Sequence, residues 1–175
     1  MINLVPHPAH PPKAARSVAV HVGMTGRGYR LFFFLHGKMA DIVVPAASDH
    51  PDRKDGLWET TCFEAFFRGV GKGYHEFNFS PSGDWASWEF DDYRGQSRET
   101  PTAISIASDG FENLLAVEVR LNADFSHSTR LCLSAVVEEE DGTKSYWAIK
   151  HPDGDSPDFH HEDCFALSLA DIAPA

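Results

Sequence analysis

Two short stretches, Cys62–Phe67 (CFEAFF) and Tyr74–Phe79 (YHEFNF), carry the clearest structural signal in this chain. In both of them apolar side chains recur at every second position, which is the period of a β-strand. The six residues between them, RGVGKG, include three glycines and suit the turn of a hairpin. A glycine-rich loop can also cradle phosphate, but it then leads into a helix, and no helix is predicted here. The two stretches therefore predict an antiparallel β-hairpin.

Other stretches that are predicted to be strands precede and follow the hairpin. They lie at Ser17–Val22, Tyr29–His36, Trp85–Phe90, Leu115–Leu121, Leu131–Val137, Tyr146–Ile149 and Phe165–Leu169. Short strands divided by turn signals, with no long helix between them, favour a sandwich or barrel over an alternating α/β fold. We expect a single all-β domain over residues 1–175, a two-sheet antiparallel β-sandwich of the immunoglobulin or jelly-roll kind. Residues 1–12, with four prolines, are expected to form an irregular arm.

Length, composition and charge narrow the classes of function. The chain has 175 residues, 42% of them apolar, so it can bury one sizeable core. Its net charge of −11 disfavours nucleic acid and anionic membranes as partners, because both attract clustered lysine and arginine. The sequence has neither an apolar run of about 18 residues nor the pattern of a signal peptide, which predicts a cytoplasmic location. Three scattered cysteines suit neither a disulfide framework nor a C-x-x-C metal site.

The hairpin sorts its side chains onto two faces. With the phenylalanines of both strands in the core, a polar set shares the opposite face: Glu64, Tyr74, Glu76 and Asn78. A pairing of Phe66 with Tyr74 would place Glu64 directly opposite Glu76. Two like charges so placed need compensation, which Arg94, Lys54, a bound cation, water or the hydroxyls of a ligand could supply.

This polar face, together with Trp58 from the adjoining loop, has the chemistry of a sugar site. Hydroxyl groups bond to carboxylate and amide acceptors in the plane of a sugar ring, while the apolar face of the ring stacks on an indole. The alternative is structural. Glu64 and Glu76 would then be solvated outward positions of a sheet, and Trp58 would belong to the core.

A resemblance to a known family rests on these residues. The run Trp58-x-x-x-Cys62-Phe-Glu64-x-Phe66, followed by Tyr74-x-Glu76-Phe-Asn78-Phe-Ser-Pro81-x-Gly83, resembles the family 9 carbohydrate-binding modules and their DOMON-like relatives, above all small stand-alone bacterial DOMON-like proteins. It extends from about Val18 to Leu169, and its specific part is residues 57–94. The resemblance implies a β-sandwich that holds a terminal sugar between two aromatic clamps, without chemistry.

On the matching positions, the resemblance implies Trp58 as one clamp, with Glu64 and Asn78 as hydrogen-bonding groups. Glu76 departs from the family pattern, which has a basic residue there. The second clamp is expected from the C-terminal region, where Phe159 lies in a polar loop and Trp147 lies on a strand that favours core packing. The predicted ligand-binding residues are Trp58, Glu64, Glu76, Asn78, Arg94 and Phe159, with no catalytic residue and no metal ligand among them.

No cofactor is expected, although three alternatives stay open. DOMON relatives can bind haem through a Met and a His, and Met24, Met39, His151 and His160 are available, though no motif singles out a pair. The adjacent His160 and His161 could hold a transition metal, but neighbours on an extended chain point in opposite directions. Calcium could bind carboxylates of the acidic loop, namely Asp49, Asp52 or Asp55, although no calcium-loop consensus is present.

We therefore expect a non-enzymatic domain that binds a carbohydrate or sugar-like small molecule. A protein-interaction module that uses the same face is the main alternative. A deep, narrow pocket would favour a sugar end, and a flat aromatic patch would favour a protein. A glycoside hydrolase would use Glu64 and Glu76 as its carboxylate pair. However, the sequence carries no nucleophile motif such as G-x-S-x-G.

Overall fold

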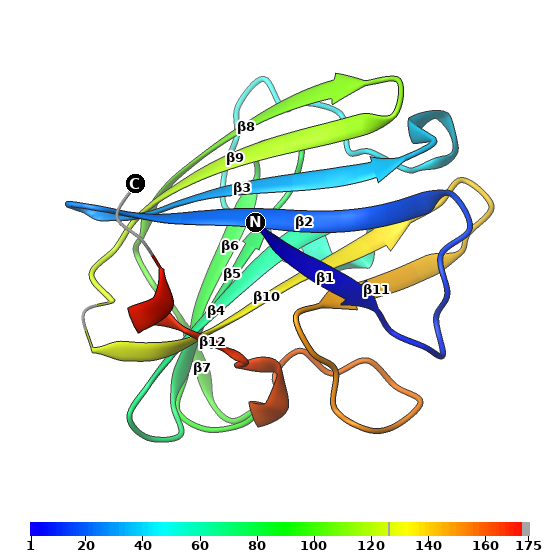
Figure 1. The fold of residues 1–175 in the computed structure, drawn as a ribbon. Coiled ribbons are helices and arrows are strands. Elements are labelled where there is room, and N and C mark those ends of the chain that lie inside the picture. Colours follow the sequence, from blue (N-terminus) through cyan, green and yellow to red (C-terminus); the bar gives the residue numbers. More distant parts are fainter. Residues whose placement is uncertain (126, 173–175) are drawn as a thin grey trace.

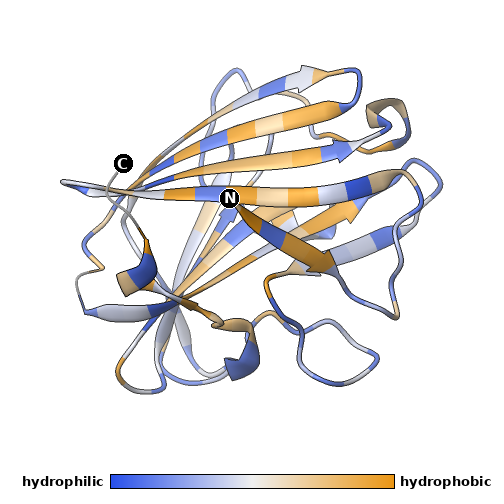
Figure 2. Cartoon of the chain, in the orientation of Figure 1, coloured by the Kyte–Doolittle hydropathy of each residue, from blue (hydrophilic) through white to orange (hydrophobic). Residues whose placement is uncertain are grey.

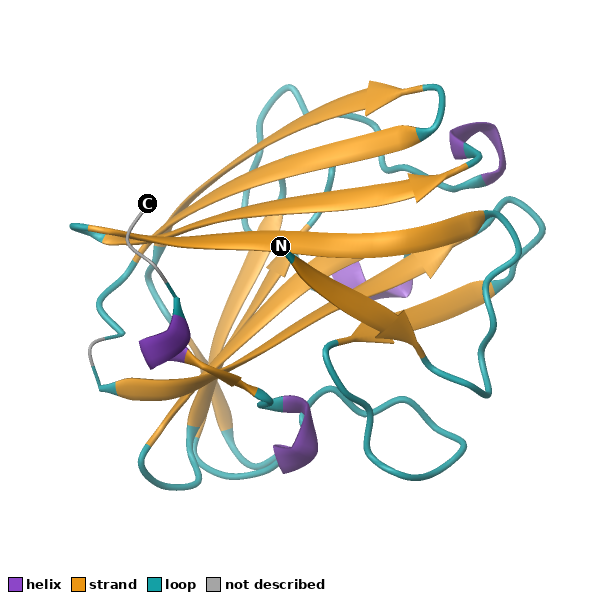
Figure 3. Ribbon diagram, in the orientation of Figure 1, coloured by secondary structure: helices purple, strands orange, loops and turns teal. Residues whose placement is uncertain are grey.

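The protein is all-β in the computed structural model, which describes residues 1–125 and 127–172. The strands are β1 (Ile2–Pro6), β2 (Ala15–Thr25), β3 (Gly28–Gly37), β4 (Cys62–Gly69), β5 (Tyr74–Phe79), β6 (Trp85–Phe90), β7 (Ser97–Glu99), β8 (Ala103–Phe111), β9 (Leu114–Asn122), β10 (Ser128–Glu138), β11 (Lys144–Ala148) and β12 (Leu167–Ser168). Short 3-10 turns occupy connections (Figure 3): η1 (Met39–Asp41), η2 (Leu57–Glu59), η3 (Glu162–Cys164) and η4 (Leu169–Asp171). Within the described ranges, no helix has the length and apolar character needed to cross a membrane.

The strands form one curled antiparallel sheet. Its order is β7-β6-β5-β4-β10-β11-β1-β2-β3-β9-β8, and β12 pairs with β10. The two halves face each other because the sheet bends back on itself (Figure 1). Strand β1 joins the halves: Leu4 pairs with Val18 of β2, and Val5 pairs with Ala148 of β11. The antiparallel all-β prediction is confirmed, whereas the expected division into two separate sheets is not.

The prediction that residues 1–12 form an irregular arm is wrong for residues 2–6, which form β1. Proline blocks a strand only where its missing N–H is needed for the ladder. The first proline, Pro6, is the last residue of β1, and Pro8 follows it. The four residues before Pro6 are therefore free to pair. Strands β7 and β8 were also not predicted, since β8 is largely exposed and lacks a continuous apolar face.

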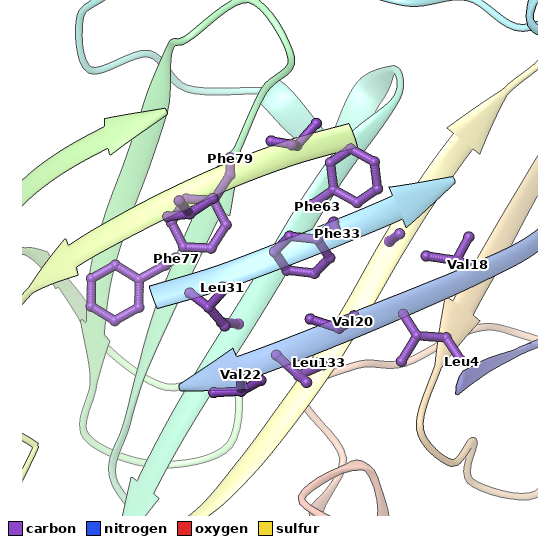
Figure 4. Close-up of a cluster of buried hydrophobic side chains, with 14 of the residues drawn as sticks. Leu4, Val18, Val20, Val22, Leu31, Phe33, Phe63, Phe77, Phe79 and Leu133 are labelled. Atoms are coloured by element: carbon purple, nitrogen blue, oxygen red, sulfur yellow. The ribbon is translucent and has the colours of Figure 1, made fainter. Parts of the chain in front are cut away.

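The core fills the inside of the curl. Alternate residues of facing strands meet there, and the orange and blue positions that alternate along several strands in Figure 2 reflect this period. The rings of Phe33, from β3, and Phe63, from β4, have centroids 4.9 Å apart. Phe77 and Phe79 of β5 lie beside them (Figure 4). These contacts pack one half of the sheet onto the other.

The β4–β5 hairpin has the predicted faces but a different register. Glu64 pairs with Asn78, and Phe66 pairs with Glu76. The proposed pairing of Phe66 with Tyr74 is therefore wrong by two residues. Strand β4 extends to Gly69, which shortens the connection to residues 70–73 and brings Arg68 opposite Tyr74. A shift by two residues preserves the face of every side chain, so the polar face is retained.

Candidate functional site

A cavity of about 510 Å³ lies on the outer face of the hairpin, opposite the core. Its floor comes from β4, β5 and β6, and its walls come from η2, β11 and the loop before η3. Five of the six predicted ligand-binding residues line it: Trp58, Glu64, Glu76, Arg94 and Phe159. The sixth, Asn78, is fully buried and donates a hydrogen bond from Nδ2 to Glu76 Oε1, 2.8 Å away. The structure thus brings all six together.

Glu64 is a buried carboxyl group in the cavity floor, with 3% of its surface exposed. Ser134, its direct neighbour on β10, donates a hydrogen bond to Oε2 at 2.8 Å. Burial, followed by the charge of Glu76, raises the pKa of Glu64 to about 8. The carboxyl group therefore carries a proton at neutral pH, which lessens its repulsion with Glu76.

Glu76 lies two residues along the ladder from the Glu64–Asn78 pair, on the same face. Burial raises the pKa of Glu76, while the hydrogen bond from Asn78 and the charge of Arg94 act in the opposite direction. The carbonyl oxygen of the Asn78 amide, Oδ1, is buried without a hydrogen-bond partner among the described residues. The two carboxyl groups of the floor are therefore held from beneath by a buried hydroxyl, that of Ser134, and a buried amide, that of Asn78.

The cations proposed to compensate the two carboxylates pair elsewhere. Arg94 places its guanidinium 2.9 Å from Asp158 Oδ1, and Lys54 Nζ lies 2.8 Å from Asp84. Arg94 has a left-handed backbone, with φ of 46°. Its N–H donates to the Tyr74 hydroxyl at 3.3 Å. Arg94 therefore forms its ion pair with Asp158 and not with Glu64 or Glu76, although it lines the cavity and its charge still lowers the pKa of Glu76.

His160 stands at the edge of the floor. The Tyr74 hydroxyl lies 2.7 Å from His160 Nδ1, and Nε2 lies 3.7 Å from Glu76 Oε2. Burial, followed by the positive charge of Arg94, lowers the pKa of His160 to about 4. Burial likewise raises the pKa of Tyr74 to about 12. Both side chains are therefore uncharged at neutral pH.

Aromatic side chains surround this polar floor. Trp58 on η2 is 43% exposed, while Phe159 is 8% exposed. Trp147, the other candidate for a second clamp, is only 2% exposed and packs in the main core. Of the two candidates, only Phe159 lines the cavity.

Sequence reasoning missed four further aromatic residues of the cavity: Phe66, Trp88, Phe90 and Tyr146. A signal for two of them was present. In the ladder between β5 and β6, Trp88 pairs with Glu76, and Phe90 pairs with Tyr74. Applying the same face assignment to the next strand would have found both. His160, which the sequence offers only as a possible ligand of metal or haem, also lines the cavity.

The alternative metal and haem residues are dispersed or engaged. Throughout the described part of the chain, no group of three or more His, Cys, Asp or Glu side chains is placed to hold a metal ion. His161 caps η3 by accepting from Asp163 N–H. In the acidic loop, Asp55 pairs with Arg53 at 2.9 Å. His151 lies 2.9 Å from the Val5 carbonyl oxygen through Nε2.

Comparisons with known proteins support the fold. No family model and no curated protein matches the chain. Among solved structures, it is similar to a protein from Bacteroides uniformis described as a "putative carbohydrate-binding protein". The TM-score is 0.62 at 16% identity, over 95% of this chain and 84% of that one. Such a likeness shows a shared fold, so membership of the family 9 modules or their DOMON-like relatives stays a prediction.

Proposed function

We propose that the protein binds a carbohydrate or sugar-like small molecule in this cavity without transforming it. One observation carries the proposal: the partly exposed indole of Trp58 and the buried carboxyl groups of Glu64 and Glu76 line the same cavity. A sugar ring offers an apolar face to the indole and hydroxyls to the floor. The similar fold of the Bacteroides uniformis protein, itself described as carbohydrate-binding in provisional terms, agrees with this proposal.

The shape of the site favours a small molecule over a protein surface. A volume of about 510 Å³ falls within the range of roughly 300–1,000 Å³ that is usual for small-molecule sites. Pro157 and Phe159, which are far from the hairpin in sequence, also line the cavity. The site is therefore formed by separate segments of the chain. A protein partner would instead need a broad exposed patch.

Binding without hydrolysis is supported by where the two carboxyl groups lie. In a glycosidase, the acid and its partner flank the scissile bond. Glu64 and Glu76 rise from adjacent strands of the same floor. A sugar that rests on Trp58 would therefore present hydroxyls to both groups from one side. We expect no release of nitrophenol from a panel of nitrophenyl glycosides.

Titration calorimetry with a panel of mono- and disaccharides tests the proposal. For any sugar that binds, Trp58→Ala should weaken affinity at least about fivefold, the loss expected when about 1 kcal/mol of stacking is removed. Phe111→Ala is the matched control, because Phe111 is 61% exposed on β8 and does not line the cavity. Unchanged affinity in Trp58→Ala, or no binding by any sugar, would contradict the proposal.

A further inference from the structure

The cavity has an unbalanced charge. Glu64 and Glu76 are its two acidic groups, and Arg94 is its only permanently cationic side chain among the described lining residues. Arg94 is committed to Asp158 at 2.9 Å, and Tyr93 also donates to that carboxylate. Among the described lining residues, no lysine or arginine therefore forms an ion pair with Glu64 or Glu76.

One carboxylate oxygen of Glu76, a residue of the cavity lining, has no hydrogen-bond partner among the described residues. Glu76 Oε1 accepts from Asn78, whereas Oε2 lies 3.7 Å from His160 Nε2, beyond hydrogen-bonding distance. His160 is uncharged at neutral pH because its pKa is lowered to about 4. Oε2 is thus an acceptor that a ligand group can approach, beside an imidazole that supplies no positive charge.

The walls are suited to a cation as well. Six aromatic side chains line the cavity, namely Trp58, Phe66, Trp88, Phe90, Tyr146 and Phe159. The negative face of an aromatic ring attracts a positive charge, most strongly for tryptophan. Trp88 already contacts one cation on the protein itself, since the Arg53 guanidinium lies 4.4 Å from its ring centroid. The net charge of −11 adds a long-range attraction for cations.

We propose that the natural ligand of the cavity carries a positively charged amine, as an amino sugar does. The inference rests on the proposed function and adds the charge of the ligand to it. The ammonium group would lie over the carboxyl groups of Glu64 and Glu76, and the ring of the sugar would stack on the indole of Trp58. A neutral sugar would fill the same space but leave the Glu76 carboxylate without a positively charged partner in the cavity.

Proton release is an independent consequence. In the free protein Glu64 holds a proton at neutral pH, since its pKa is raised to about 8. An ammonium group bound beside it favours the ionised carboxylate and lowers this pKa. Binding of an amine at pH 7 should therefore release close to one proton, whereas binding of the neutral sugar should release none. Calorimetry in two buffers of different ionisation enthalpy measures this number.

The deciding experiment compares glucosamine, glucose and N-acetylglucosamine, and the galactose series in parallel, by calorimetry at pH 7. The amino sugar of at least one series should bind ten times more tightly than its neutral and N-acetylated forms. Equal or tighter binding of the neutral sugars overturns the inference but leaves sugar binding intact. Absence of binding by all of these sugars contradicts both proposals.

Two charge-neutralising variants assign the effect to the cavity. Glu76→Gln should bring the ratio of amino-sugar to neutral-sugar affinity close to one, and Glu64→Gln should abolish the proton release. Glu89→Gln is the matched control, because Glu89 lies on the other face of β6 and pairs with Arg98 at 2.7 Å. The inference fails if Glu76→Gln keeps the full preference for the amine, or if Glu89→Gln loses it equally. A melting curve of each variant confirms that it is folded.

Discussion

Both faces of the β4–β5 hairpin are largely buried, but they differ in what covers them. The inner face carries Phe63, Phe77 and Phe79, which pack tightly against the other half of the sheet. On the outer face, Glu64 and Glu76 are also buried, yet they lie under a cavity of about 510 Å³. Burial of a carboxyl group is costly, whereas burial of a phenyl ring is favourable. The inner face therefore stabilises the fold, and the cost of burying carboxyl groups on the outer face is the reason that we place the proposed ligand there.

Removing a ring from the inner face should have the largest effect. Phe63→Ala deletes a fully buried side chain and leaves a cavity in a packed core. We expect a loss of about 3–5 kcal/mol in the free energy of unfolding. Urea denaturation measures this loss of stability. Phe111→Ala, at an exposed position, is the control and should lose less than about 0.5 kcal/mol. A small loss at Phe63 would break the distinction between the two faces.

The outer face should make stability depend on pH. The pKa of Glu64 is raised from 4.5 to about 8 on folding, so the folded state holds this proton more tightly than the unfolded state. Its stabilising contribution is complete below pH 4.5 and is lost as pH rises towards 8. Between pH 5 and pH 9 we expect a decrease on the order of 2–4 kcal/mol from this group.

Glu64→Gln cannot titrate and should lose less stability over the same range. Urea denaturation of both proteins at pH 5, 7 and 9 makes the comparison. Parallel curves for the variant and the natural protein would show that Glu64 is not the titrating group. The sign is also diagnostic, because a salt-bridged carboxylate would produce the opposite trend.

The hydrogen bond beneath the cavity should have the smallest effect. Ser134→Ala removes the hydroxyl that donates to Glu64, at a cost of about 1 kcal/mol. That bond favours the ionised carboxylate, so its loss should raise the pKa of Glu64 further. Denaturation and the pH profile give both values. Ser105→Ala, on the exposed face of β8, is the control, and an equal effect there would rule out a specific role for Ser134.

Much of the candidate site followed from the period of the hairpin. Strand parity alone placed Glu64, Glu76 and Asn78 on one face, and this holds in the structure despite the wrong pairing. The direct partners did not follow, because a shift of two residues leaves the alternation of faces unchanged. Loop length decides between such registers, and here β4 continues to Gly69.

Contacts between distant segments were the least predictable. Arg94 is 64 residues from its partner Asp158, and no periodic pattern links them. The position of β1 between the two halves of the sheet was equally hard to predict. Its pairing partners lie on β2 and on β11, which are far apart in the chain. The choice between Phe159 and Trp147 as a cavity residue also depended on how the C-terminal loop lies on β10 and β11.

The all-β class, the hairpin, its two faces and the side chains available on the outer face follow from local alternation and turn chemistry, so they can be derived from the amino-acid sequence alone. Three features become visible only in the folded molecule: the single curled sheet, the lining of the cavity by η2 and the C-terminal loop, and the ion pair of Arg94 with Asp158. These features depend on which distant surfaces meet and on what burial does to charge, and neither is encoded in any one stretch of sequence.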